Sequence, residues 1–136
     1  MADSRFKPLD HPSDIGLIAF GKDNKEIFAN AAYGMFSLMA DLDQVEPRLT
    51  FKIMANGEDL ETLLINWLNE LIFYEDSKKV LLKKFEINKL TDKNIEASVR
   101  GEKIDLQKHV IFRPIKAATY NQLRIDKNQA KIIFDV

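Results

Sequence analysis

Two aspartates far apart in this chain each stand beside an apolar stretch. Asp14 precedes residues 15–20, which are nearly all apolar, and Asp135 follows Ile132-Ile133-Phe134. A carboxylate at the mouth of a buried strand is costly unless a cation or hydrogen-bond donors pair it. Hard divalent cations such as calcium, magnesium and manganese prefer carboxylate and carbonyl oxygens. If the two strand ends meet, Asp14, Asp135 and the terminal group of Val136 would supply such oxygens.

A plainer interpretation of the same residues stays open. Asp14 could simply cap a turn, and Asp135 could be solvated near the chain end. The two histidines are further candidates for ligand binding. His11 could help to ligate a metal or contact a phosphate, and His109, beside Lys108, could bind an anion. The alternatives are a locally hydrogen-bonded loop residue for His11 and a solvated loop residue for His109.

Two further groups of polar residues carry weaker signals. Glu102 and Asp105 could serve as acid, base or ligand, although an exposed charged loop is the default interpretation. Lys116, Thr119 and Tyr120 could donate hydrogen bonds to an anionic partner or could be outward residues of a half-buried strand. The chain has no glycine-rich phosphate loop and no dinucleotide fingerprint. Neither histidine has a nearby serine arrangement that suggests a catalytic triad.

Hydrophobic periodicity predicts the elements that position these residues. Gly34 lies inside the first helical pattern, which predicts close packing of that helix against the sheet. Residues 101–114 read as a polar, irregular connection. Helices are expected at 25–41 and, capped by Asp59, at 60–72, and strands at 5–9, 15–20, 50–55, 79–89, 94–100, 116–126 and 130–136.

Composition sets the broad class. With 136 residues, of which 46% are hydrophobic and 30% are charged, the chain suits a single domain over residues 1–136. The expected fold class is α+β, with two helices packed on a largely antiparallel or mixed β-sheet in one compact domain.

Charge and cysteine content exclude several functions. The 20 basic and 21 acidic residues give a net charge of −1, which argues against a stand-alone nucleic-acid binder. The absence of cysteine excludes disulfides, thiolate zinc sites and thiol nucleophiles. No signal-peptide pattern and no apolar run near the roughly 20 residues of a membrane helix are present, so we expect a cytoplasmic protein with no membrane partner.

Ordered motifs along almost the whole chain resemble those of the archease family. They are His11-Pro12-Ser13-Asp14-Ile15-Gly16, Asn30-Ala31-Ala32, Gly57-Glu58-Asp59-Leu60, residues 64–71, Gly101-Glu102, Asp105, His109, residues 115–120 and Phe134-Asp135-Val136. Members typically read His-Thr-Ala-Asp-Ile-Gly at the first motif, so Pro12 and Ser13 are departures. Asn121 stands where members commonly have histidine, so this chain offers an amide in place of the imidazole at that position.

The resemblance implies a non-catalytic activator of the GTP-dependent RNA ligase that joins 2′,3′-cyclic-phosphate or 3′-phosphate ends to 5′-hydroxyl ends. Such a protein promotes guanylylation of the ligase and repeated turnover in tRNA splicing or RNA repair, and it meets RNA only through the ligase. The resemblance also implies a divalent metal held by Asp14, Asp135 and the carbonyl of Val136. Calcium is the expected ion, with magnesium or manganese as alternatives. His11, His109 and Lys116 are candidates for auxiliary or partner-contacting roles.

Two other classes of function remain as alternatives. The first is a general chaperone or interaction module for RNA-processing enzymes, in which the metal site is structural. The second is a free-standing metal hydrolase, which is less favoured because the sequence offers no nucleophile or base beyond the carboxylates.

Overall fold

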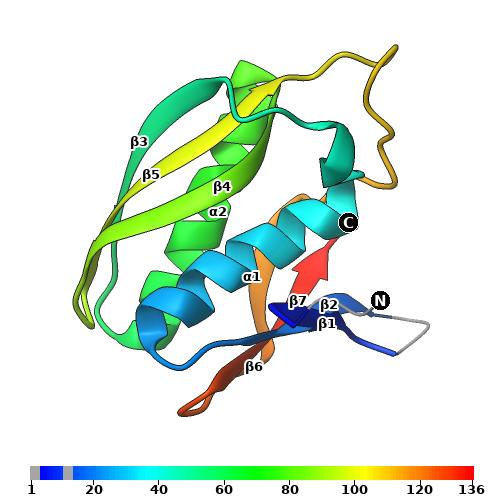
Figure 1. Ribbon diagram of the computed structural model, residues 1–136. Coiled ribbons are helices and arrows are strands. Elements are labelled where there is room, and N and C mark those ends of the chain that lie inside the picture. The colour runs from blue at the N-terminus through cyan, green and yellow to red at the C-terminus, as the bar shows by residue number, and fades with distance from the viewer. Residues whose placement is uncertain (1–3, 11–13) are drawn as a thin grey trace.

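Helices and strands follow one another along the chain in the predicted order (Figure 1). A computed structural model describes residues 4–10 and 14–136. The elements are β1 (Phe6–Pro8), β2 (Ile15–Phe20), α1 (Asn24–Met39), a 3-10 turn η1 (Leu42–Gln44), β3 (Leu49–Asn56), α2 (Leu60–Lys78), β4 (Val80–Leu90), β5 (Asn94–Lys103), β6 (Ala117–Ile125) and β7 (Gln129–Asp135). The predicted α+β class with two α-helices is confirmed.

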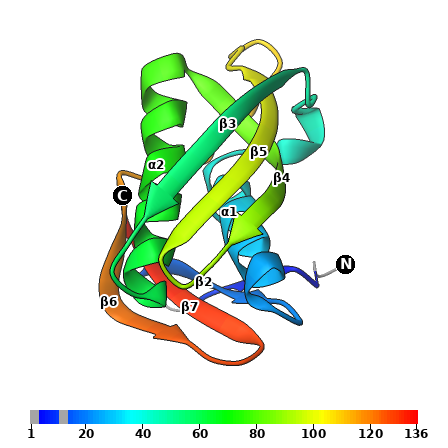
Figure 2. The ribbon, with the colours of Figure 1, turned by 90° about the vertical axis from the view of Figure 1, so that its left-hand side faces the viewer.

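The strands divide between two antiparallel sheets. One sheet has the order β1-β2-β7-β6 and the other the order β3-β5-β4. Helix α1 contacts β2 and β4, and α2 contacts β3 and β6, so each helix touches both sheets. Figures 1 and 2 show the helices lying between the sheets, where both can bury their apolar faces. This arrangement leaves the ends of β2 and β7 together at one edge of the molecule.

Each α-helix begins at an aspartate that satisfies an otherwise unpaired amide. The Glu26 N–H donates to Asp23 Oδ1 at 2.9 Å, and the Thr62 N–H donates to Asp59 Oδ1 at 2.8 Å. Asp59 is the cap that the sequence predicts. No helix in the described part of the chain is long and apolar enough to cross a membrane.

The close helix–sheet packing predicted from Gly34 is confirmed. A Cβ atom at this position would lie 2.7 Å from Cδ2 of Leu17 in β2 and 2.8 Å from Cγ of Phe6 in β1. A side chain at position 34 would therefore push α1 away from the four-stranded sheet.

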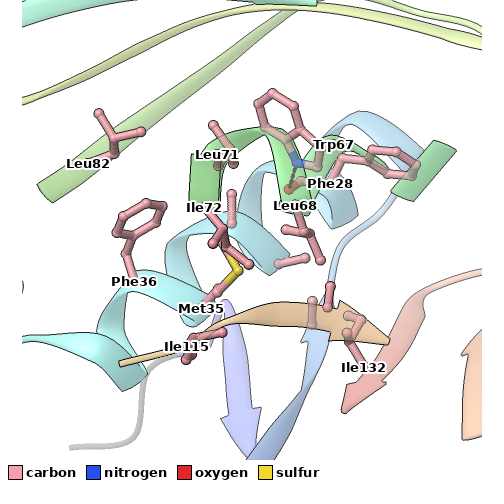
Figure 3. Close-up of a cluster of buried hydrophobic side chains, with 14 of the residues drawn as sticks. Phe28, Met35, Phe36, Trp67, Leu68, Leu71, Ile72, Leu82, Ile115 and Ile132 are labelled. Atoms are coloured by element: carbon pink, nitrogen blue, oxygen red, sulfur yellow. Dashed lines mark hydrogen bonds between the residues drawn. The ribbon is translucent and has the colours of Figure 1, made fainter. Parts of the chain in front are cut away.

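The helices and both sheets share one hydrophobic core. Its largest member is Trp67, which is fully buried and donates a hydrogen bond from Nε1 to the Phe28 carbonyl oxygen at 3.0 Å (Figure 3). The bond joins α2 to α1 and satisfies the indole N–H away from water. Leu17 and Ile132 face each other across β2 and β7 and extend the core to the four-stranded sheet.

The prediction that β5 ends at residue 100 is wrong, because Gly101–Lys103 continue the strand. Gly101 pairs with Leu82 beside an irregularity in β4, and a Cβ atom there would lie 1.8 Å from the Leu81 carbonyl oxygen. Glycine permits this close approach of the β4 and β5 backbones, so β5 continues beyond residue 101. Glu102 consequently lies in a strand and is buried, whereas the sequence favours an exposed loop.

Candidate functional site

The pairing of β2 with β7 brings Asp14, just before β2, close to Asp135, at the end of β7. Ile15 pairs with Phe134 as the last pair of the ladder, and Asp14 and Asp135 are the next residues beyond that pair, so the register directs them toward each other. Directly opposite residues on antiparallel strands have Cβ atoms roughly 4.5–5.5 Å apart, with side chains on one face. Both aspartates line one pocket of about 490 Å³. Two carboxylates that line one pocket can share one cation.

The pocket is lined by groups that offer oxygen atoms. Thr119 and Asn121 from β6 and Val136 from the chain end contribute to it, and no lysine, arginine or histidine is among its described lining residues. The Thr119 hydroxyl donates to the Ile133 carbonyl oxygen at 2.8 Å and accepts from the Asn121 N–H at 3.3 Å. Carboxylate, amide and carbonyl oxygens are the ligands that hard cations prefer.

The donor set of the pocket therefore fits a hard divalent cation. No group of three or more histidine, cysteine, aspartate or glutamate residues that could hold a metal ion is found within residues 4–10 and 14–136. A cation between Asp14 and Asp135 would take two carboxylates and complete its shell with main-chain, amide or water oxygens, as calcium commonly does.

A bulge in β6 shapes one side of this pocket. The pairing passes from Thr119 opposite Ile133 to Arg124 opposite Lys131, so β6 carries extra residues between two nearby positions of β7. Gln122 adopts a left-handed φ of 54°, and its Oε1 accepts a hydrogen bond from the Lys131 ammonium group at 2.8 Å. Bulges bend a strand and redirect its side chains, which brings Asn121 to the pocket.

Helix α2 anchors the strand that carries the bulge. Asn69 accepts a hydrogen bond from the Ala118 N–H at 2.8 Å and donates to the Ala118 carbonyl oxygen at 3.4 Å. One residue earlier in β6, Ala117 pairs with Asp135. The side chain of Asn69 therefore fixes the start of β6, and with it the wall of the pocket.

The remaining predicted site residues lie in different places. Val136 is exposed and lines the aspartate pocket. The Lys116 N–H donates to the Asp135 carbonyl oxygen at 2.8 Å, but its side chain belongs to a separate groove beside α2. His11 lies outside the described residues.

A second group of charged side chains gathers around Glu102, and sequence reasoning missed it. Its Oε1 lies 2.8 Å from Nζ of Lys108, 2.8 Å from Nε2 of His109 and 3.0 Å from the N–H of Glu46, and its Oε2 lies 3.5 Å from Nε of Arg48. The Lys108 hydrogen bond is the main reason that the pKa of Glu102 is lowered to about 2. The same bond raises the pKa of Lys108 above its usual range.

The interpretation of His109 as a solvated loop residue is wrong. Its side chain has no exposed area, and its Nδ1 accepts a hydrogen bond from the Asp105 N–H at 3.0 Å. Because Nδ1 is the acceptor, Nε2 carries a proton and donates to Glu102. Buried in this way, His109 closes the turn after β5 and ties it to Glu102. No local pattern marks this burial, because the contact between His109 and Glu102 forms only in the folded chain.

Comparison with known proteins identifies similar sequences over nearly the full length. The model of the archease protein family matches residues 6–136. Protein archease of Sulfurisphaera tokodaii is 38% identical over 124 residues, which cover 90% of this chain and 88% of that protein. Protein archease-like of Drosophila melanogaster is 36% identical over 128 residues, which cover 92% of this chain and 82% of that protein.

Two solved structures are also similar to this chain. The solution structure of Methanobacterium thermoautotrophicum protein 1598 aligns with a TM-score of 0.80 and 30% identity, covering 98% of this chain and 100% of that chain. A Thermotoga maritima crystal structure, described as an archease and "possible chaperone", aligns with a TM-score of 0.57 and 20% identity, covering 96% of each chain. The second likeness is one of fold alone.

Proposed function

The chain belongs to the archease family, and we propose that it is a non-catalytic, metal-binding activator of the GTP-dependent RNA ligase. In this role it would promote guanylylation of the ligase and allow repeated turnover. The observation that carries the proposal is the meeting of Asp14 and Asp135 in one pocket rich in oxygen donors. Asp135 and Val136 are exposed, so a partner protein can reach the site.

The proposed metal ligands are Asp14, Asp135 and a main-chain oxygen of Val136. Calcium is the proposed ion, with magnesium or manganese as alternatives, because all three prefer oxygen ligands. When bound, the cation would place positive charge within reach of the phosphate oxygens of a nucleotide. The chain's own residues hold the site in position: Asn69 fixes β6, and the bulge at Gln122 directs Asn121 toward the aspartates.

The polar groups at this pocket favour binding over catalysis. The Thr119 hydroxyl already donates to the Ile133 carbonyl oxygen, and no histidine among the described lining residues stands beside it as a base. The near-zero net charge suits a protein that docks on an enzyme and meets RNA through it.

Multiple-turnover RNA ligation with the purified GTP-dependent ligase tests the proposal. Asp14→Ala and Asp135→Ala should each abolish stimulation of the ligase while the circular dichroism spectrum stays unchanged. Asp92→Ala, at an exposed turn between β4 and β5, is the matched control and should stimulate like the natural protein. Unchanged stimulation by either variant of the aspartate pair would overturn the proposal.

A general chaperone is the second candidate function. It draws on the description of the Thermotoga maritima structure and on the exposed apolar side chains between Leu106 and Phe112. A chaperone would suppress aggregation of unrelated proteins, whereas an activator acts only when the ligase is present. Assays with the ligase and with an unrelated unfolded protein therefore separate the two functions.

A further inference from the structure

An apolar groove of about 740 Å³ runs between the second half of α2 and the connection from β5 to β6. We refer to it as the α2 groove. Phe73 on α2 and Leu106 and Ile111 on the connection line its sides, and Glu75 and Asp76 add carboxylates to the α2 side. The site described above does not use these residues.

The sides of the α2 groove expose an unusual amount of apolar surface. Phe73 is 61% exposed and Leu106 is 77% exposed, and five of the nine exposed large apolar side chains in the described part of the chain are Phe73 and residues of the segment 106–112. Single exposed apolar residues are ordinary, but a gathered set marks an interaction surface. Phe73, Leu106 and Ile111 line the groove itself, and Val110 and Phe112 belong to the same exposed segment, so this gathering requires an explanation.

The exposed segment is held in place by hydrogen bonds to the end of α1. The Asp41 N–H donates to the Val110 carbonyl oxygen at 3.0 Å, and the Phe112 N–H donates to the Met39 carbonyl oxygen at 2.8 Å. The apolar side chains thus project from an anchored backbone. An anchored apolar surface loses little conformational entropy when a partner covers it.

Charges of both signs line the groove, with Arg113 and Lys116 on the connection to β6 and Asp76 and Glu75 on α2. The Glu75 side chain is half-buried, and no hydrogen bond or ion pair joins its carboxylate to another described residue. Burial, with a smaller contribution from the neighbouring Asp76, raises the pKa of Glu75, and the positive charge of Lys79 offsets part of this rise. Asp76 itself lies 3.6 Å from the ammonium group of Lys79. A cation placed beside Glu75 would compensate the charge that the fold leaves partly desolvated.

The α2 groove adjoins the aspartate pocket. Lys116 and Ala117 are among the residues that line the groove, and Ala117 pairs with Asp135 across β6 and β7. A single partner can therefore cover the α2 groove and the aspartate pocket at once. Two linked contacts raise the overall affinity of that partner above the affinity of either contact alone.

We propose that the α2 groove is a second docking surface for the ligase, which rests on the function proposed above. It takes a short segment of that enzyme with at least two large apolar side chains and one lysine or arginine that pairs with Glu75. The apolar side chains of the ligase segment fill the groove between Phe73 and Leu106, and its lysine or arginine forms an ion pair with Glu75. This assigns attachment to the groove and activation to the aspartate pocket.

Calorimetric titration of the purified ligase measures attachment separately from activation. Leu106→Ser should raise the dissociation constant about tenfold or more, Glu75→Lys by a similar factor and Glu75→Gln by about threefold. Met54→Ser, at an exposed position on β3, and Glu61→Lys, in the first turn of α2, are the matched controls and should stay within about twofold of the natural protein. Leu106 and Glu75 contribute little to the core, so these variants should fold.

Each outcome of this titration has a distinct meaning. If the natural protein binds and Leu106→Ser and Glu75→Lys bind equally well, the groove proposal fails and the activator function stands. If the natural protein neither binds nor stimulates the ligase, the proposed function fails and the groove proposal fails with it. If sedimentation shows a dimer that Leu106→Ser disrupts while ligase affinity is unchanged, a second copy occupies the groove and the proposal is overturned.

Discussion

Glu102 and the Asp14–Asp135 pair differ in the described side chains that surround their carboxylates. Glu102 is buried beneath Lys108, His109 and Arg48, and its charge is balanced by the chain itself. Asp14 and Asp135 share a pocket whose described lining residues include no basic side chain. The first arrangement stabilises the folded chain, and the second, we propose, is completed by a cation. The same type of group, a carboxylate, thus has a stabilising role at Glu102 and a proposed binding role at Asp14 and Asp135, because the fold places different side chains beside it.

The largest expected difference between the two regions is in stability. Glu102→Gln should lower the free energy of unfolding by about 2 to 3 kcal/mol, because Lys108 and Arg48 lose their buried counter-charge. Both cations retain contact with water, which keeps the loss below that of a fully buried pair. Asp135→Asn should change the free energy by less than about 0.5 kcal/mol. Urea denaturation measures both, and equal losses would remove the distinction between a stabilising and a binding carboxylate.

A smaller effect is expected where the scaffold supports the aspartate pocket. Asn69→Ala should cost about 1 to 2 kcal/mol, because the Ala118 N–H loses its hydrogen-bond acceptor at a buried position. The loosened start of β6 should also weaken calcium binding severalfold. Asn66→Ala is the control, since Asn66 donates to the Asn56 carbonyl oxygen on the exposed side of the same helix. If both variants bind calcium like the natural protein, Asn69 does not position the pocket.

The pH dependence of stability should belong to Glu102. Its pKa is about 2 in the folded chain and 4.5 in its unperturbed state, so its contribution is present above pH 4.5 and is lost as pH falls toward 2. We expect a loss of about 1 kcal/mol by about pH 3, after allowance for water around Lys108 and Arg48. Denaturation at several pH values should show a shallower decline for Glu102→Gln than for the natural protein. Parallel curves would contradict the assigned role.

The smallest effect is expected at an exposed ion pair. Arg124 Nε lies 3.3 Å from Asp126 Oδ2, and both side chains are well exposed. Arg124→Gln should therefore change the free energy of unfolding by less than about 0.5 kcal/mol. A loss as large as that of Glu102→Gln would mean that burial does not distinguish the Glu102 cluster from a surface pair.

The sequence predicts much of the fold because local patterns determine it. The apolar stripes of α1 and α2, the cap at Asp59 and the alternation in β5 all follow from periodicity and are confirmed. The division of the strands into two sheets does not follow from these patterns, because local alternation does not state which strand pairs with which.

The two carboxylate regions differ in how far the sequence could predict them. Asp14 and Asp135 are conspicuous because each stands beside an apolar strand, and the pairing of β2 with β7 then brings them to one pocket. The Glu102 cluster is hidden because Glu46 lies 56 residues before Glu102 and joins it only in the folded chain. The continuation of β5 through Gly101, which buries Glu102, depends on the irregular pairing with β4.

Calorimetric titration of calcium into the natural protein, Asp135→Asn and Glu102→Gln tests the central claim most directly. We predict one calcium ion per chain for the natural protein, affinity weakened at least about tenfold in Asp135→Asn, and unchanged affinity in Glu102→Gln at a temperature where it is folded. Magnesium and manganese titrated in parallel identify the preferred ion. Equal calcium affinity in the natural protein and Asp135→Asn would contradict a metal site between the two aspartates.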